Sequence, residues 1–169
     1  KIVAATKADG GSIAAAEMFN EPNFASMGGA SKGYDAEMYG RDFKAFLAYV
    51  REAVPEMQVA GPSAVGDVGM MDHMPASMHG LHAEDLLRTE GPGLDIFSYH
   101  FYGGVSQRCA RMGNIPHSSP ETALSNEWLS LTKRDEAFYA ALRDKYAPGK
   151  PLWLTETGET ACGGNPWAS

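Results

Sequence analysis

The sequence predicts an α/β fold in which parallel strands alternate with helices. Short apolar runs typical of buried strands are separated by longer stretches whose apolar residues recur at helical spacing. Two of the apolar runs, 14–19 and 151–154, lead directly to a carboxylate and then break, at Pro22 and at Gly158 respectively. Alternation of this kind is typical of a parallel sheet covered by helices.

The chain opens with a helix end and a strand. Residues 1–8 are expected to close a helix, and 9–12 to turn into the strand at 14–19. Pro22 stops that segment. Because the residue before a proline is kept out of the helical region, we expect Glu21 to be extended at the mouth of the strand.

The strongest helix signal follows at 35–54. Its apolar residues recur at helical spacing, and Pro55 ends it; they are Met38, Phe43, Phe46, Leu47 and Val50. A short strand is expected at 57–60, where Gly61 and Pro62 end the apolar run.

The second half repeats the alternation. Gly- and Pro-rich breaks and long loops separate its elements, which are a helix at 82–89, a strand at 94–100, helices at 121–131 and 133–146, and a last strand at 151–154. Residues 63–80 are expected to form a loop rich in Met and Gly, and 103–120 a long polar loop on the active face.

Composition and charge indicate the class of protein and exclude some kinds of partner. The 169 residues suit one domain, and 44% apolar with 21% charged residues is typical of a globular protein. A net charge of −7 without a basic stripe argues against nucleic acid and anionic membranes as partners. No window approaches the roughly 18 uninterrupted apolar residues of a membrane span.

Glu21 and Glu156 are the candidate catalytic residues. Two carboxylates at the ends of separate strands are what glycoside hydrolysis needs, one as acid and one as base or nucleophile. Glu159 competes with Glu156 but lies beyond Gly158, in a predicted loop. The alternative for Glu21 is a surface glutamate in a turn.

Other polar residues leave alternatives open. His100 and Tyr102 share one face of their strand, because strand side chains alternate; they could line a site or fill the core. Cys109 and Cys162 could form a disulfide or remain free thiols, and a disulfide would favour an extracytoplasmic location. The pair at His79 and His82 lacks a metal-binding motif around it, so we expect no metal site there.

Three motifs resemble a known family. The run 20–22 (Asn-Glu-Pro) resembles the strand 4 signature of the large glycosidase clan built on the (β/α)8 TIM barrel. The run 153–157, followed by Cys162, Gly163 and Gly164, is similar to the strand 7 nucleophile region of the heparanase and β-glucuronidase family, and 98–102 looks like that family's strand 6.

This resemblance implies that residues 1–169 are part of a (β/α)8 barrel, from about strand 4 through strand 7. We therefore expect an internal piece of a longer enzyme, secreted or periplasmic. The remaining barrel strands and a C-terminal β domain would then belong to the rest of that enzyme.

The resemblance also implies roles. Glu21 would be the acid/base and Glu156 the nucleophile of a retaining enzyme that hydrolyses β-glucuronides without metal or organic cofactor. Asn20 would bind the sugar 2-hydroxyl, and His100 and Tyr102 would line the sugar subsite. Backbone N–H groups at 163–164 would bind the substrate carboxylate. A β-glycosidase for neutral sugars, or a carbohydrate-binding module without activity, are the alternatives.

Overall fold

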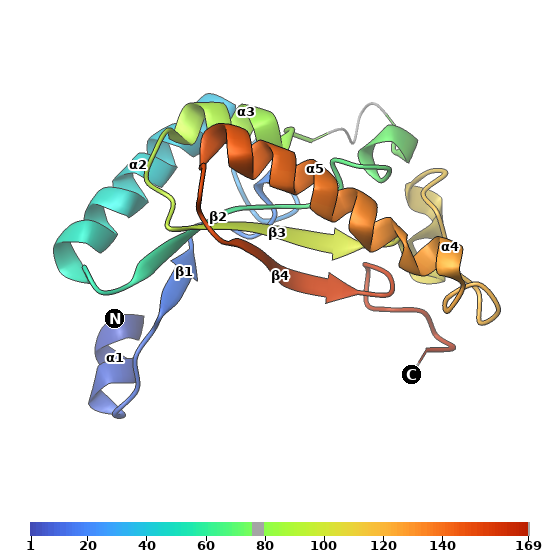
Figure 1. The fold of residues 1–169 in the computed structure, drawn as a ribbon, viewed down its shortest axis with the longest axis horizontal. Helices are drawn as coiled ribbons and strands as arrows, with labels where there is room; N and C mark the ends of the chain where they lie inside the picture. Colours follow the sequence, from blue (N-terminus) through green and yellow to red (C-terminus); the bar gives the residue numbers. More distant parts are fainter. Residues whose placement is uncertain (76–79, 169) are drawn as a thin grey trace.

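The computed structural model describes residues 1–75 and 80–168, which form one parallel sheet with helices along one face (Figure 1). The sheet runs in chain order, β1-β2-β3-β4. Its strands are β1 (Ala15–Glu17), β2 (Gln58–Ala64), β3 (Ile96–Tyr102) and β4 (Leu152–Gly158). All three neighbouring pairs are parallel. Because sequential parallel strands joined through helices are the repeating unit of a (β/α)8 barrel, the predicted fold class is confirmed.

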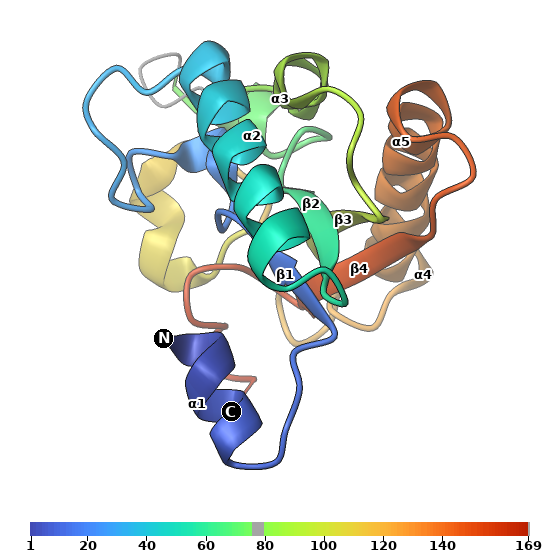
Figure 2. The same cartoon turned by 90° about the vertical axis from the view of Figure 1, so that its left-hand side faces the viewer.

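Helices connect the strands and lie on the outer face. Figures 1 and 2 show the longer helices on the same side of the sheet; they are α2 (Ala36–Ala53), α3 (Ala83–Glu90) and α5 (Leu131–Tyr146). The short α1 (Ile2–Ala8) precedes β1, and α4 (Asn126–Leu129) precedes α5. The described helices include none that is long and apolar enough to cross a membrane.

Local sequence explains the position of α2. The side chain of Asp35 accepts a hydrogen bond of 2.9 Å from the Met38 backbone N–H and so caps the first turn. Gly40 lets the helix lie against α3, because an added Cβ would come within 2.6 Å of the Thr89 carbonyl oxygen. Phe43 and Val50 are fully buried beneath the helix.

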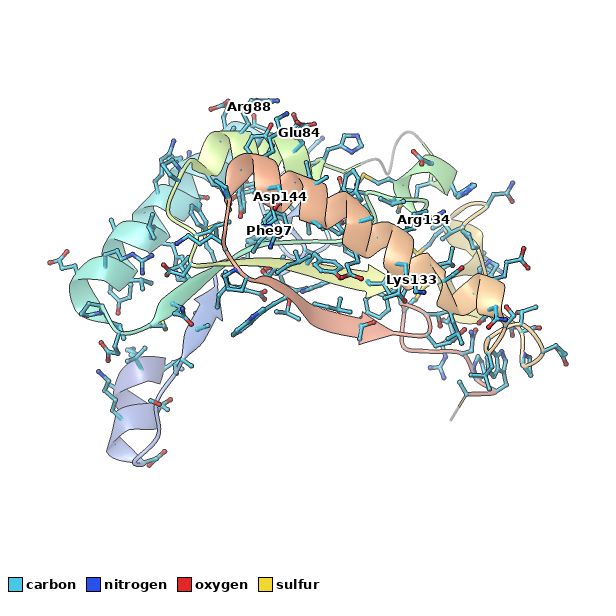
Figure 3. The ribbon with its side chains drawn as sticks, in the orientation of Figure 1. Glu84, Arg88, Phe97, Lys133, Arg134 and Asp144 are labelled. Carbon is cyan, nitrogen blue, oxygen red and sulfur yellow. A yellow bond between two sulfur atoms is a disulfide. The ribbon has the colours of Figure 1, made fainter. Side chains whose placement is uncertain are left out.

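Aromatic side chains form the core between β3 and α5. The ring of Tyr139 lies 4.7 Å from that of Tyr99 and 6.4 Å from that of Phe97. Figure 3 shows Phe97 between the sheet and α5. Tyr99 and Phe97 therefore define the helix-facing side of β3, and the alternate residues of this strand point to the opposite, inner face.

The sheet is curled into a half-barrel. Although β1 and β4 are its outermost strands, the hydroxyl of Thr155 on β4 donates a 3.0 Å hydrogen bond to Glu17 Oε1 on β1. Side chains from the two outermost strands can meet only if the sheet bends around its inner face. That face is partly open, and Trp153 on it remains 44% exposed.

Several predicted boundaries were wrong. The strand at 14–19 shortens to β1, because it has a partner only on the β2 side among the described residues. The strand at 57–60 continues through Gly61 and a cis Pro62 to the end of β2. Proline is tolerated there because β1 pairs with β2 no further than Ala60, so Pro62 needs no N–H toward β1.

The last elements also differ from expectation. The helix predicted at 121–131 begins only at α4, where the Ser125 side chain caps it by accepting from the Trp128 backbone N–H. The strand predicted at 151–154 extends to Gly158, which places Glu156 inside β4. His79, half of the histidine pair considered from sequence, lies outside the described residues.

Candidate active site

Glu21 is held at the carboxyl end of β1 by a sharp turn. Its backbone has φ 49° and ψ 59°, in the left-handed region, so the expectation of an extended residue was wrong. A following proline disfavours only the right-handed helical region. The chain turns at once into a 3-10 turn over Pro22–Phe24, where the Phe24 N–H donates to the Glu21 carbonyl at 2.9 Å.

Asn23 fixes this turn, and sequence reasoning missed it. Its side chain is 1% exposed. It donates to the Leu81 carbonyl and to Asp67 Oδ2, and accepts from the Val65 backbone N–H. An asparagine after Glu-Pro looks like ordinary turn chemistry, and its partners lie more than 40 residues away in sequence.

β3 supplies two inward side chains. His100 is 1% exposed, and its Nδ1 lies 3.0 Å from Glu21 Oε1 and 3.7 Å from Glu156 Oε2. Tyr102, two residues further along the same face, donates its hydroxyl hydrogen to Glu156 Oε1. Burial, and then the hydrogen bond to this carboxylate, raise the pKa of the Tyr102 hydroxyl well above its usual range.

Glu156 faces His100 because β4 contains one extra residue. Tyr99 pairs with Leu154 and His100 pairs with Glu156, which makes Thr155 the additional residue of a β-bulge. A bulge shifts the alternation of side chains by one position. If Thr155 paired with His100 in a regular ladder, Glu156 would pair with Phe101 and point toward the helices.

Glu21, His100 and Glu156 thus converge on one point. One ligand-type atom from each lies within 4.8 Å of the other two. The carboxylate side chains keep 27% and 44% of their surface exposed, so a substrate can reach them. Carboxyl groups about 5–5.5 Å apart are typical of retaining glycosidases, whereas inverting enzymes hold them about 6.5–9.5 Å apart.

The same three side chains could also hold a cation. Two of their oxygen atoms already have hydrogen-bonding partners, since Glu21 contacts His100 and Glu156 accepts from Tyr102. The expectation of a reaction without metal stays a prediction.

The remaining predicted site residues, Asn20, Gly163 and Gly164, lie on the segments that follow β1 and β4. Asn20, directly before Glu21, is exposed to solvent. Gly163 and Gly164 follow β4, with φ 75° and 72°, and the adjoining Cys162 is also left-handed, with φ 65°. The roles predicted for Asn20, Gly163 and Gly164 stay predictions.

Glu159 is turned away from the cluster. Its Oε2 accepts hydrogen bonds from Thr160 Oγ1 and Asn165 Nδ2. It lines a different cavity, of about 560 Å³, together with Trp128 and Trp167. These contacts favour Glu156 over Glu159 as the reacting carboxylate.

A disulfide joins Cys109, in the segment after β3, to Cys162, after β4, with 6.3 Å between the Cα atoms. The same two segments also share backbone hydrogen bonds. Ala161 N–H donates to the Gly104 carbonyl, and Ser106 N–H donates to that of Ala161. The loops above β3 and β4 are therefore bound together next to Tyr102.

An apolar cavity of about 180 Å³ lies beside Glu21 and Tyr102. Its wall contains residues that follow each of the four strands, including Phe24, Met70 and Met112. The carboxyl ends of parallel strands meet at one edge of a sheet, which is where active sites of (β/α)8 barrels are found.

No family model and no curated protein sequence matches the chain. Solved structures do resemble it. A monomeric β-xylosidase from Caulobacter crescentus CB15 matches with a TM-score of 0.54 and 17% identity, over 86% of this chain and 26% of its own. A glycoside hydrolase family 39 enzyme from Xanthomonas axonopodis pv. citri matches with a TM-score of 0.51 and 18% identity, over 86% and 25% respectively.

A family 44 endoglucanase from Clostridium thermocellum matches with a TM-score of 0.56 and 16% identity, over 89% of this chain and 37% of its own. The chain thus spans about a quarter to two fifths of the length of these structures. At such identities the likeness shows the fold alone, which is part of a (β/α)8 barrel.

Proposed function

We propose that the chain carries the catalytic centre of a retaining glycoside hydrolase. The observation that supports this most is the convergence of Glu21, His100 and Glu156 within 4.8 Å at the carboxyl ends of the strands. The similar structures, a β-xylosidase, a family 39 enzyme and a family 44 endoglucanase, agree with the reaction class.

In the proposed first step, Glu156 attacks the anomeric carbon and the bond to the leaving oxygen breaks. Glu21 gives its proton to that oxygen, and a glycosyl-enzyme ester forms on Glu156. Tyr102 orients the attacking carboxylate through its hydroxyl. In the second step water attacks the same carbon, Glu21 takes a proton from this water, and Glu156 is released.

We further propose β-glucuronides as substrates. The turn at 162–164 lies a short distance beyond the end of β4, and its two glycines leave the backbone N–H groups uncovered by side chains of their own. Such groups can bind a carboxylate without a basic side chain. In this proposal Asn20 binds the sugar 2-hydroxyl, and further strands of the natural polypeptide complete the barrel next to β1 and β4.

A second candidate is a β-glycosidase for neutral sugars. It is favoured by the similar structures, which include a β-xylosidase and an endoglucanase. The same carboxylates would act, without a role for 163–164. The nitrophenyl β-glucuronide and β-glucoside, assayed side by side, distinguish the two candidates, and preference for the glucoside rules out the glucuronidase proposal.

The disulfide supports a secreted or periplasmic location, which we include in the proposal, because such bonds persist in oxidising compartments.

The test of the mechanism uses the natural polypeptide that contains this sequence. Glu156→Gln and Glu21→Gln are each expected to lower kcat by about 10⁴-fold or more for an unactivated glycoside, in line with the loss of a catalytic group. Glu159→Gln is the matched control and should retain activity.

Azide separates the two roles. With Glu156→Gly it should restore turnover and yield the glycosyl azide of inverted configuration, because azide replaces the missing nucleophile. With Glu21→Gly it should yield the azide of retained configuration, because azide attacks the glycosyl-enzyme. Full activity in both glutamine variants would contradict the proposal.

A further inference from the structure

The apolar cavity beside Glu21 has walls that cannot bind a sugar by hydrogen bonding. Apart from Glu21 and Tyr102, its lining side chains carry no hydroxyl, amide or charged group. Four of them are methionines, Met27, Met70, Met74 and Met112. The hydroxyl hydrogen of Tyr102 is already donated to Glu156.

The cavity borders only one of the two candidate catalytic carboxylates. Glu21 is part of its wall, and Glu156 is not. In a retaining glycosidase the acid contacts the departing oxygen, while the nucleophile approaches the anomeric carbon from the other face of the sugar. A group that occupies the cavity therefore lies on the leaving-group side.

The chemistry of the wall selects the kind of leaving group. A sugar unit in this cavity would bury hydroxyl groups without partners, and each such group costs roughly 1–3 kcal/mol. An alkyl or aryl group has no such cost. Methionine side chains are flexible and polarizable, so they adapt to apolar groups of different shapes.

The size of the cavity matches a small group. An apolar cavity of roughly 150 Å³ accommodates benzene, and this one measures about 180 Å³. Met27 is 68% exposed, so part of the wall borders solvent.

We propose that this cavity is a leaving-group subsite for an apolar aglycone, a single aromatic ring or a short alkyl chain. The inference rests on the proposed glycosidase function. It assigns as substrates the alkyl and aryl β-glycosides, in preference to oligosaccharides.

The first experiment is a series of alkyl β-glycosides, from methyl to butyl, on the sugar that the natural polypeptide hydrolyses. The leaving alcohols differ little in acidity, so kcat/KM reports on the subsite. Full burial of one methylene corresponds to a gain of about fourfold, and we expect a gain of two- to fourfold per methylene. A flat series would overturn the inference.

A second comparison keeps the ring size constant. The cyclohexyl β-glycoside should be hydrolysed at least tenfold faster, as kcat/KM, than the β-linked disaccharide with the same glycone. A faster reaction with the disaccharide would overturn the inference, because the subsite would then recognise hydroxyl groups.

Filling the cavity tests its location. Met112→Trp, or Ala161→Leu as a second variant, should abolish the gain along the alkyl series. Met38→Trp on α2, away from the cavity lining, is the control and should keep the gain. If both filling variants keep it, the subsite lies elsewhere.

Glycosyl fluorides separate this inference from the function on which it rests. Fluoride leaves without occupying an aglycone subsite, so the filling variants should hydrolyse β-glucuronyl or β-glucosyl fluoride within about twofold of the wild-type rate. If the wild type hydrolyses neither fluoride, the proposed glycosidase function itself fails. If it hydrolyses a fluoride but shows a flat alkyl series, only the subsite assignment fails.

Discussion

Tyr102 and Glu156 form the most direct side-chain contact in the candidate site. The tyrosine pKa is raised by burial and by this carboxylate, so the hydroxyl keeps its hydrogen over the whole range in which an enzyme works. Tyr102 therefore acts as a permanent donor that holds Glu156 in place.

Replacing Tyr102 by phenylalanine tests this positioning role. A hydrogen bond to a charged group contributes roughly 1.5–3 kcal/mol, so Tyr102→Phe is expected to lower kcat about 10- to 150-fold with KM little changed. Tyr99→Phe is the matched control, because Tyr99 lies on the helix-facing side of β3 against Tyr139. A large rise in KM with kcat unchanged would mean that Tyr102 binds substrate instead.

Some features of the individual site residues could be predicted from the sequence, and others could not. Strand ends marked by Pro22 and Gly158 were enough to choose Glu21 and Glu156 as candidates. Alternation along β3 left His100 either in a site or in the core, and only the family resemblance implied that it lines the sugar subsite. The left-handed conformation of Glu21 could not be predicted, because the rule for residues before proline leaves more than one region open. The anchoring role of Asn23 depends on distant partners that no local pattern reveals.

At the scale of elements, the bulge in β4 decides which carboxylate reaches the site. Alternation along β4 alone would place Trp153 and residue 155 on the inner face, and Glu156 on the outer one. Thr155 reverses this phase after Leu154. A bulge has no clear sequence signature here, so its prediction required the register between β3 and β4.

Deleting Thr155 should leave Glu156 in the site, because Glu156 would then follow Leu154 directly and still pair with His100. Only the bulge and the hydrogen bond from Thr155 to Glu17 are lost, so the hydrolysis of a glycosyl fluoride should fall far less than the loss of about 10⁴-fold or more expected for removal of a catalytic group. Thr155→Val keeps the bulge and loses only that hydrogen bond, so it is the control and should retain activity. Circular dichroism checks that the deletion variant is folded; a folded deletion variant as inactive as Glu156→Gln would contradict the register argument.

The alternation of strands and helices was predictable because each element has its own period of apolar residues. The boundaries of the strands and helices were less predictable. β2 extends past Pro62 for a reason that lies in β1, and α4 begins at the Ser125 cap rather than at the first helix-forming residue. A neighbouring strand determines the first boundary, and a local side-chain cap determines the second.

At the scale of the whole molecule, the half-barrel leaves an incomplete surface. β1 and β4 each have a neighbouring strand on one side only among the described residues, and Trp153 and Leu154 on β4 are 44% and 37% exposed. Unpaired strand edges with apolar side chains favour association with other chains.

The isolated 169 residues are therefore expected to aggregate or to unfold without cooperativity. The measurement is a thermal melt followed by circular dichroism, with reheating and size-exclusion chromatography. The natural polypeptide that contains this sequence serves as the control. A single reversible transition of a monomer would contradict the expectation.

The two connections between the loops above β3 and β4 differ in what can break them. A reductant opens the bond between Cys109 and Cys162 but leaves the parallel bridge between Val105 and Ala161 and its hydrogen bonds intact. The segment at Ala161, which forms part of the cavity wall, is thus held both by a disulfide and by backbone hydrogen bonds. The loops should therefore keep their shape in a thiol-rich medium.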